Sequence, residues 1–551
     1  MLKRVTIGIL LVLVVTRCVG PAHAGQQAGP DSILFNGKIF TSVAAHPYVQ
    51  ALAIHGERIV ATGDSAKMRS LAGPRTRLID LLGRTVIPGI NDAHIHLELS
   101  PADTVDLPLD SLNPTWAQVK DALVAAVAKA GTGTLVRAYI GPTVFLDHEV
   151  TREPLDKLAP DHPVILASVT GHADILNSRA LAMIGIRNSQ ADPLGGRFER
   201  SADGRLTGVA REYAALSIAR KLADLTGDAA AIDQLREALS QATSFGITSL
   251  QDMSNVIEPE RTVTLLAKVP TPIRVRVIRM PLTSPSGRDT AEGRSLPRNP
   301  DPRVTVSGTK WMLDGTPVER TFEARDERRS GMPFETVFSD FGLTFPGVEI
   351  EKMLRESLQN NDQLAVHTFG HNSAAAMLSA MDATGGPRVW AGRRVRFEHG
   401  DGLFPDLIPR VKEMGVIVVQ NPSHLDVLTI FPGLSLTRAQ PLRSLLSAGI
   451  PVALGSDGPI NPFLNILFAS THPDRPSESI TREQAVIAYT LTAAAAEFAE
   501  KEKGSLEPGK LADLAVLSQD IFTVPAPGLP KTRSVLTLVG GKVVYDGRKR
   551  D

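Results

Sequence analysis

The 551-residue sequence has little cysteine, no net charge and no run of hydrophobic residues long enough to cross a membrane. Its single cysteine, Cys18, excludes a disulfide framework. Lysine plus arginine and aspartate plus glutamate each number 59, so the formal net charge is zero. A neutral chain gives no electrostatic reason to expect nucleic acid as a partner. The composition, 43% hydrophobic and 21% charged, is instead that of a globular protein.

The N-terminal segment has the layout of a secretory signal peptide. Two basic residues precede the apolar run of residues 7–15, and a small-x-small site ending at Ala24 follows. An uncleaved membrane anchor is the alternative, but the run is well short of the ~20 residues that a span needs, and Arg17 interrupts it. We therefore predict a signal peptide at residues 1–24, cleavage after Ala24, a secreted or periplasmic protein and no stable membrane insertion. Cleavage would remove Cys18 and leave no thiolate chemistry.

Both ends of the remaining chain contain short strand-like segments separated by turn signals. Asn36-Gly37 lies between two such segments near the start, and Gly540-Gly541 lies between two near the end. The matching character of these segments predicts that residues 25–85 and 505–551 form one small β domain assembled from both termini.

The central region repeats a pattern in which an apolar, strand-like run precedes a helical stretch. Runs rich in valine and isoleucine between helices are typical of a parallel sheet that is buried on both faces. Eight such units predict a (β/α)8 TIM-like barrel over residues 86–504, with its active site at the carboxyl ends of the strands. About 150 residues separate the first two runs, so residues 100–230 are predicted to be a large inserted subdomain that covers the barrel mouth. The runs are "RTVIPGINDAHIH", "FGITSLQDM", "IRVRVIRM", "RVTVSGTKWMLDG", "QLAVHTFG", "RVRFEHGD", "GVIVVQNPSH" and "IPVALGSDG".

Residues of metal-ligand type recur at the carboxyl ends of these runs. Strand residues at positions i and i+2 share a face, so the two histidines of the first run can both point to the barrel axis. A lysine on the fourth run, histidines on the fifth and sixth and an aspartate on the eighth would reach the same rim. The predicted metal-site residues are His94, His96, Lys310, His367, His399 and Asp457.

Each of these residues has an ordinary explanation when it is taken alone. A His-x-His pair can be polar residues at a strand end, and a single histidine is usually a core residue with satisfied hydrogen bonds. Lys310 alone could be an exposed base, and Asp457 a turn residue. The joint pattern favours a metal site, because separate strands place such residues at matching ends. His148, His162 and His472 fall in apparent loops and are predicted to be solvated.

The ligand types indicate the chemistry. Neutral imidazoles and carboxylates suit Zn²⁺ or a similar divalent ion. A protonated lysine is a poor ligand, but reaction with CO2 would turn Lys310 into a carbamate able to bridge two ions. Without that modification a site with one ion is expected. Asp457 would take the proton from the attacking water and deliver it to the leaving group.

The motifs also resemble a known family. The order His-x-His, Lys, His, His, Asp and the segment "GSLEPGKLADLAVL" are similar to the amidohydrolase superfamily. "GHADILNSRAL", "GVAREY", "KWMLDGT" and "RFEHGDG" resemble amidohydrolase family 3, which includes proteins similar to N-substituted formamide deformylase and to exoenzyme regulators. The match runs from about residue 31 to the end. It implies that the terminal β domain is a β-sandwich beside the barrel.

The resemblance also implies residue roles. His94, His96 and Asp457 would hold one metal ion and His367 and His399 the other, with carbamylated Lys310 between them. His172 and Glu212 match family positions that imply substrate binding, and Asp314 of "KWMLDGT" is also predicted to bind substrate. A structural explanation for His172 is that it packs beside a helix capped at Asn177. Where the family usually has Ala-Ile-Gly-Asp-Arg-Ala after the fifth-strand histidine, this sequence has "HTFGHNSA", which places the substrate pocket in question rather than the metal site.

These features predict a metal-dependent hydrolase that cleaves a C–N bond of a small amide, N-acyl or formamide-type molecule with metal-activated water. The same site acting on an ester or lactone is the alternative, as is a non-catalytic binding or regulatory protein on the same fold. A structural role in the cell envelope has little support, because the chain has no repeats. A homo-oligomer is left open. The charged segment 325–338 is either a lid or a solvated loop.

Overall fold

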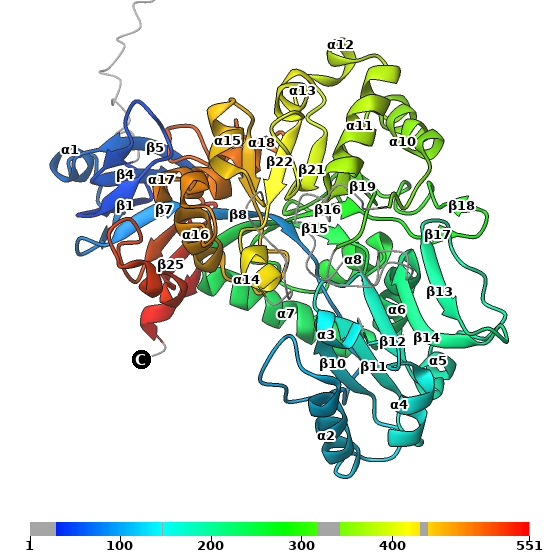
Figure 1. The fold of residues 1–551 in the computed structure, drawn as a ribbon. Helices are drawn as coiled ribbons and strands as arrows, with labels where there is room; N and C mark the ends of the chain where they lie inside the picture. The colour runs from blue at the N-terminus through cyan, green and yellow to red at the C-terminus, as the bar shows by residue number, and fades with distance from the viewer. Residues whose placement is uncertain (1–28, 146, 317–341, 430–438, 550–551) are drawn as a thin grey trace, which may run out of the picture.

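The computed structural model describes residues 29–145, 147–316, 342–429 and 439–549 (Figure 1). The predicted signal peptide and the segment 325–338 lie outside the described residues. Within them, no helix is both long and apolar enough to cross a membrane.

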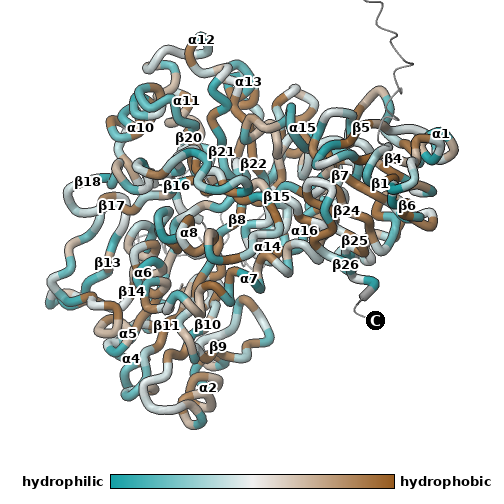
Figure 2. The backbone as a smooth tube through the Cα atoms, turned by 180° about the vertical axis from the view of Figure 1, so that it is seen from behind, coloured by the Kyte–Doolittle hydropathy of each residue, from teal (hydrophilic) through white to brown (hydrophobic). Residues whose placement is uncertain are grey.

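Strands from both ends of the chain form two sheets that share a core. The first sheet has the order β5-β4-β1-β6, and the second has the order β26-β25-β24-β7-β2-β3. One hydrophobic cluster joins Leu34 and Ile54 of the first sheet to Leu514 and Leu538 of the second, so the two sheets pack as a β-sandwich. In Figure 2, brown hydrophobic stretches follow these strands. The bounds are β1 Ser32–Phe35, β2 Lys38–Phe40, β3 Tyr48–Val49, β4 Ala51–His55, β5 Arg58–Gly63, β6 Arg77–Asp80, β7 Thr85–Pro88, β24 Leu514–Leu517, β25 Ser534–Val539 and β26 Lys542–Asp546.

The centre of the molecule is an eight-stranded parallel barrel, as predicted. Its strand order is β23-β22-β21-β20-β19-β16-β15-β8, and each of the eight predicted runs supplies one strand. Apolar side chains such as Val277, Val366 and Val418 are fully buried in this sheet. The bounds are β8 Ile90–Ile95, β15 Ile247–Ser254, β16 Arg274–Arg279, β19 Val304–Met312, β20 Leu364–Thr368, β21 Arg396–His399, β22 Ile417–Gln420 and β23 Val452–Leu454.

The barrel nearly closes where the chain leaves its last strand beside its first. The amide of Asp457 donates a hydrogen bond of 2.9 Å to the carbonyl of His94. Gly455 allows this approach, because a Cβ atom at that position would lie 2.5 Å from the Cβ of His94. A tight backbone contact therefore holds the first predicted ligand beside the last.

Helices surround the barrel and follow most of its strands. Leu235 and Leu239 of α7 and Met377 of α11 belong to one hydrophobic core cluster together with apolar residues of the strands. The bounds are α7 Asp228–Ser244, α8 Pro259–Leu266, α10 Gly347–Gln359, α11 His371–Ala383, α12 Pro387–Trp390, α13 Ile408–Glu413, α14 His424–Thr429, α15 Leu442–Ser447, α16 Pro462–Thr471, α17 Arg482–Ile487 and α18 Ala493–Ala495; α1 Ser65–Arg69 lies in the β-sandwich, and a small hairpin pairs β17 Thr283–Ser284 with β18 Gly287–Arg288.

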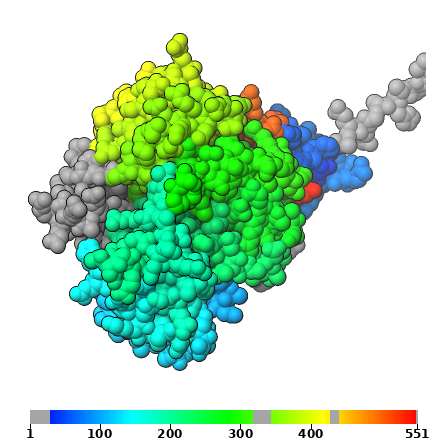
Figure 3. Space-filling view, turned by 90° about the vertical axis from the view of Figure 1, so that its right-hand side faces the viewer, coloured from blue at the N-terminus to red at the C-terminus, as the bar shows by residue number. Residues whose placement is uncertain are grey.

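The long stretch between the first two barrel strands folds as a separate sheet with its own helices. Its strand order is β13-β14-β12-β11-β10-β9, and Leu123 and Phe145 belong to a core of its own. Figures 1 and 3 show this part, in cyan, against the barrel, on a different side from the blue β-sandwich. The bounds are β9 Val105–Asp106, α2 Trp116–Val127, β10 Val136–Ile140, α3 Pro142–Phe145, α4 Arg152–Leu158, β11 Val164–Ser168, β12 Ala173–Leu176, α5 Ser178–Met183, β13 Gly196–Arg200, β14 Leu206–Glu212 and α6 Tyr213–Asp224.

Candidate metal centre at the barrel mouth

All six predicted metal-site residues lie at the carboxyl end of the barrel. The register of the parallel strands places these residues at matching strand ends. Met312, two residues after Lys310, lies opposite His367, and Thr368 lies opposite His399. The six side chains are buried or nearly so, and that of His96 is the most exposed, at 21%. The strand ends therefore bring these residues to one place, although their ligation of a metal stays a prediction.

Asp457 lies at the centre of this group. Its Oδ1 is 3.6 Å from Nε2 of His94 and 3.4 Å from Nε2 of His96, while its Oδ2 is 3.6 Å from Nδ1 of His399. Potential ligand atoms of His94, His399 and Asp457 all lie within 4.8 Å of one another. Three side chains from the first, sixth and eighth strands could thus contact a single ion.

His367 and Lys310 complete the group. The ring of His367 lies 4.4 Å, between centroids, from that of His399. Nζ of Lys310 lies 3.0 Å from Nε2 of His94, in a fully buried position. Burial lowers the pKa of Lys310 to about 8, because a charged amine is poorly solvated there.

Burial also keeps the imidazoles in the form that can bind a metal ion. It lowers the pKa of His94 to about 4, with Lys310 adding to the effect, and lowers the pKa values of His367 and His399 below their usual range. A neutral imidazole has one nitrogen with a free lone pair, which is the ligand atom for Zn²⁺. The histidines are therefore neutral at physiological pH, as ligation requires.

The backbone is strained at several site residues. Non-glycine residues with positive φ include His399 (72°), Asp457 (42°) and Glu212 (53°). Such conformations cost about 1–3 kcal/mol and persist where surrounding structure enforces them, often at functional sites. His399 is the last residue of β21, so its positive φ coincides with the end of that strand.

A buried arginine and glutamate lie behind His94. Glu398 Oε2 is 2.6 Å from Nδ1 of His94, and Glu398 Oε1 accepts a hydrogen bond of 2.7 Å from Nε of Arg396. Burial alone would raise the pKa of Glu398, but Arg396 and His94 outweigh it and lower the pKa to about 2. Nδ1–H of His94 thus donates to a carboxylate, which leaves Nε2 facing the site. Sequence reasoning did not select either residue, although both lie at buried positions on one face of β21.

Asp314 occupies the corresponding position behind His367. Its Oδ1 is 2.8 Å from Nδ1 of His367 and accepts from the amide of Phe369, and its Oδ2 accepts from the amide of Gly370 at 2.7 Å. Its side chain is fully buried. These contacts favour a role in orienting His367, and the substrate contact expected for Asp314 stays a prediction.

The inserted sheet contributes His172 and Glu212 to the same region. His172 lies between β11 and β12, and its ring is 4.7 Å from that of His367. Nδ1 of His172 is 2.8 Å from Oε2 of Glu212, at the end of β14. Asn177 caps α5, as expected if His172 only packs beside that helix. His172 nevertheless also reaches the site.

Two further histidines follow barrel strands. His424 is the first residue of α14, after the seventh strand, and its Nε2 lies 3.4 Å from Oδ2 of Asp457. Sequence reasoning missed it, although the end of the seventh run indicates its position. His371, which lies in the unusual "HTFGHNSA" segment, stacks on Phe404 at 4.8 Å, and its Nε2 is 3.5 Å from Oδ2 of Asp406.

Two of the loop histidines that were predicted to be solvated are buried. His162 is 7% exposed, and its Nδ1 lies 3.2 Å from the carbonyl of Thr134. His472 is fully buried between the carbonyl of Ala439 and the amide of Arg475. The prediction was wrong for both, because their ring nitrogens form hydrogen bonds with backbone groups of other residues. His148 is exposed, as predicted.

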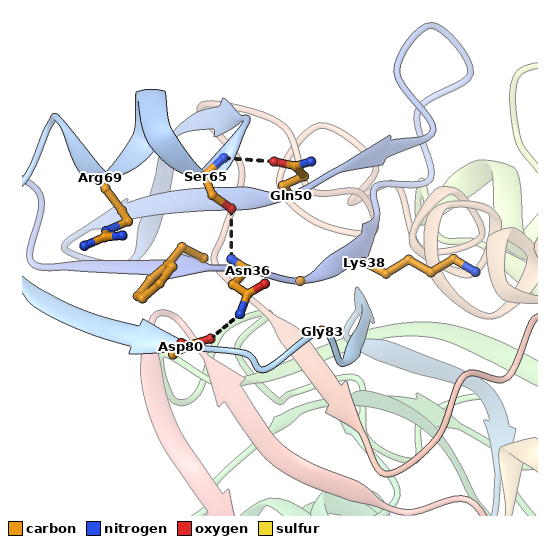
Figure 4. A pocket seen from close by; sticks show the side chains of 9 residues that line it. Asn36, Lys38, Gln50, Ser65, Arg69, Asp80 and Gly83 are labelled. Atoms are coloured by element: carbon orange, nitrogen blue, oxygen red, sulfur yellow. Dashed lines mark hydrogen bonds between the residues drawn. The ribbon is translucent and has the colours of Figure 1, made fainter.

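A polar hollow lies in the β-sandwich, away from the barrel mouth (Figure 4). Its polar groups bond to one another: the amide of Asn36 donates to Oγ of Ser65, Nδ2 of Asn36 donates to Asp80, and the amide of Ser65 donates to Oε1 of Gln50. These polar groups therefore already have partners within the hollow, and the candidate chemistry stays at the barrel.

Comparisons with known proteins identify the family of the chain. A model described as "Amidohydrolase family" matches residues 77–545. The chain is 27% identical to Protein LONG AFTER FAR-RED 3 of Arabidopsis thaliana, over 94% of this chain and 91% of that protein. It is 26% identical to N-substituted formamide deformylase of Arthrobacter pascens, over 94% of this chain and 98% of the relative. A crystal structure of an uncharacterized metal-dependent hydrolase from Pyrococcus horikoshii OT3 has a TM-score of 0.65 at 20% identity, covering 90% of this chain and 99% of that chain.

The fold and the site define the class of metal-dependent barrel hydrolases. Within that class the chain belongs to the amidohydrolase family, since the family model covers most of its length. The predictions of this family, of the barrel fold and of a hydrolytic enzyme acting on C–N bonds are therefore confirmed. The residue roles, the domain boundaries, the metal identity and secretion stay predictions.

Proposed function

We propose that the protein is a zinc-dependent hydrolase of small N-acyl or N-formyl compounds, acting outside the cytoplasm. The observation that carries the proposal is the convergence of the imidazoles of His94, His96 and His399 on the carboxylate of Asp457 at the barrel mouth. A relative named for N-substituted formamides, 26% identical over nearly its whole length, supports the substrate class. The N-terminal signal-peptide pattern supports export.

The residues present fit a divalent metal ion. His94, His96 and Asp457 would hold one ion, and His367 and His399 could hold a second. Nitrogen and carboxylate ligands without sulfur suit Zn²⁺. When bound, the metal lowers the pKa of a coordinated water and polarises the substrate carbonyl.

Lys310 determines whether the site holds one or two ions. Its buried amine has a pKa of about 8, so an appreciable fraction is uncharged near neutral pH and can attack CO2. The new N–C bond forms a carbamate and releases one proton. We propose this modification, with the carbamate between the two groups of ligands. An unmodified Lys310 would accompany a single ion.

Asp457 is the proposed proton carrier. Its carboxylate would accept a proton from the attacking water and deliver it to the leaving nitrogen. Burial alone would raise the pKa of Asp457, but the imidazoles of His94, His424 and His96 outweigh it and hold this pKa well below its usual range. The carboxylate is thus ionised at neutral pH, which is the form that a proton acceptor requires.

Hydrolysis of matched substrates by the metal-loaded and the chelated protein tests the proposal. Zinc-loaded protein should release amine from N-formyl and N-acetyl amines faster than it cleaves the corresponding esters, and chelation should abolish both activities. Asp457→Asn should lose amide hydrolysis, whereas the exposed Asp103→Asn should not. Unchanged turnover by Asp457→Asn would refute the mechanism, and a preference for esters would refute the substrate class.

A further inference from the structure

His424 lies between two carboxylates at the barrel mouth. Its Nε2 is 3.4 Å from Oδ2 of Asp457, and its Nδ1 is 3.7 Å from Oδ2 of Asp401. The imidazole is 19% exposed. Because its two nitrogens face opposite partners, the ring connects a predicted catalytic carboxylate to a second carboxylate that has no assigned role.

Asp401 depends on His424 for compensation of its charge. It is fully buried, and among the described residues neither of its carboxylate oxygens accepts a hydrogen bond within normal geometry. A buried carboxylate without a partner is costly, so this position needs a nearby cation or hydrogen-bond donor. Within the described part of the chain, His424 is the one group that forms an ion pair with Asp401. Their contact gives the imidazole a fixed orientation.

The two oxygens of Asp457 face different partners. Oδ1 faces Nε2 of His94 and Nε2 of His96, both predicted metal ligands. Oδ2 faces Nδ1 of His399 and Nε2 of His424. Nδ1 of His399 is also 3.0 Å from the amide oxygen of Asn421, which can only accept a hydrogen bond. The proton on this nitrogen therefore points to Asn421, and Nε2–H of His424 is the donor that faces Oδ2.

We infer that His424, supported by Asp401, is a positioning residue that holds Oδ2 of Asp457 and so directs Oδ1 toward the metal ligands. The inference rests on the proposed function, because it concerns the orientation of the proposed proton carrier. It adds a chain of three side chains, Asp401, His424 and Asp457, that joins the ends of the sixth, seventh and eighth strands. The contact with substrate is left to Asp457.

Replacement of His424 by alanine, asparagine and glutamine separates a positioning role from a structural one. The side-chain nitrogen of glutamine lies near the place of Nε2 of histidine, and that of asparagine lies near the place of Nδ1. His424→Ala and His424→Asn should therefore lower kcat by about 10- to 100-fold with KM changed less than about threefold, while His424→Gln regains most of kcat. His162→Gln is the matched control, since it replaces a buried histidine whose Nδ1 lies 3.2 Å from the carbonyl of Thr134. Equal activity of all three His424 variants and the wild type would overturn the inference.

A double-mutant cycle tests the contribution of Asp401. If Asp401 acts through His424, Asp401→Ala should lower kcat in the wild type and have no further effect in His424→Ala. Independent, multiplying effects of the two substitutions would overturn the role of Asp401. Zinc content measured for every variant should stay at the wild-type level, because neither residue is a predicted ligand. A loss of zinc would show that His424 acts as a ligand and would overturn the assignment.

Crystal structures of zinc-loaded wild-type protein and His424→Ala provide a readout that does not depend on activity. In the wild type, Oδ2 of Asp457 should lie within hydrogen-bond distance of Nε2 of His424, and the carboxylate should rotate in the variant. An unchanged Asp457 in the variant would overturn the inference. If the wild type hydrolyses none of the amides, the proposed function fails, and the structures still decide the orientation of Asp457.

Discussion

Glu398→Gln is the most informative single substitution behind the metal centre. Glutamine keeps the volume of glutamate but removes the charge that faces Arg396 and Nδ1 of His94. Glu398 and Arg396 are both fully buried, and among the described residues Glu398 is the carboxylate in ion-pair contact with Arg396. The substitution therefore leaves a buried guanidinium without its countercharge.

Two figures indicate how much Glu398→Gln lowers the free energy of unfolding. Removing one partner of a buried ion pair typically lowers the free energy of unfolding by about 3–5 kcal/mol. The pKa of Glu398, about 2 against an ordinary 4.5, corresponds to about 3 kcal/mol at 1.36 kcal/mol per unit. Because the pKa is depressed, this stability is present above the unfolded-state value near 4.5, so pH 7 lies inside the window. We expect a loss of about 3 kcal/mol.

Urea unfolding of the chelated protein measures this loss, and competition with a chelating dye measures zinc affinity. Zinc affinity should fall by about 10- to 100-fold, since Glu398 orients the predicted ligand His94. Glu500→Gln is the control, because Glu500 pairs with Arg394 at a partly exposed site and should cost less than about 1 kcal/mol. Unchanged zinc affinity together with a stability loss no larger than that of Glu500→Gln would refute the reasoning.

Three further predictions concern other parts of the structure. Glu497→Gln should lower the free energy of unfolding by about 3 kcal/mol at pH 7, because Lys503 loses its buried partner at 2.8 Å. Burial alone would raise the pKa of Glu497, but Lys503 outweighs it and lowers this pKa below its ordinary 4.5, so urea unfolding should show the difference between wild type and variant closing as the pH falls below 4.5 and the wild-type carboxylate is protonated. A gap independent of pH would contradict this assignment. Gly455→Ala should lower zinc affinity measured by dye competition, since the added Cβ would lie 2.5 Å from that of His94, and unchanged affinity would show that the contact relaxes freely. Asp314→Ala should lower kcat by about 10- to 100-fold with little change in KM if Asp314 orients His367, whereas a rise in KM alone would restore its expected contact with substrate.

Much of the barrel could be predicted because its strands carry a strong local signal. Val and Ile runs mark each strand, and strand ends are the places where ligand-type residues such as His367 and Asp457 appear. Period-2 alternation then placed His94 and His96 on one face without knowledge of any tertiary contact.

The supporting residues could not be assigned from sequence alone, because their roles depend on neighbours that are distant along the chain. Glu398 faces His94 across 304 positions, and His424 faces Asp457 only because the seventh and eighth strands end together. The amides of Phe369 and Gly370 donate hydrogen bonds to Asp314, which lies more than 50 positions earlier, and the sequence alone does not indicate these contacts. Parallel pairing creates such contacts, and a single strand does not reveal them.

Anomalous diffraction at the zinc edge, from crystals of the zinc-loaded protein, tests the central claim most directly. The account predicts a strong peak bounded by Nε2 of His94, Nε2 of His96 and a carboxylate oxygen of Asp457, with nitrogen–zinc distances of about 2.0–2.1 Å. A second peak beside His367 and His399 would accompany a carbamate on Lys310. A fully zinc-loaded crystal with no peak at the barrel mouth would contradict the account.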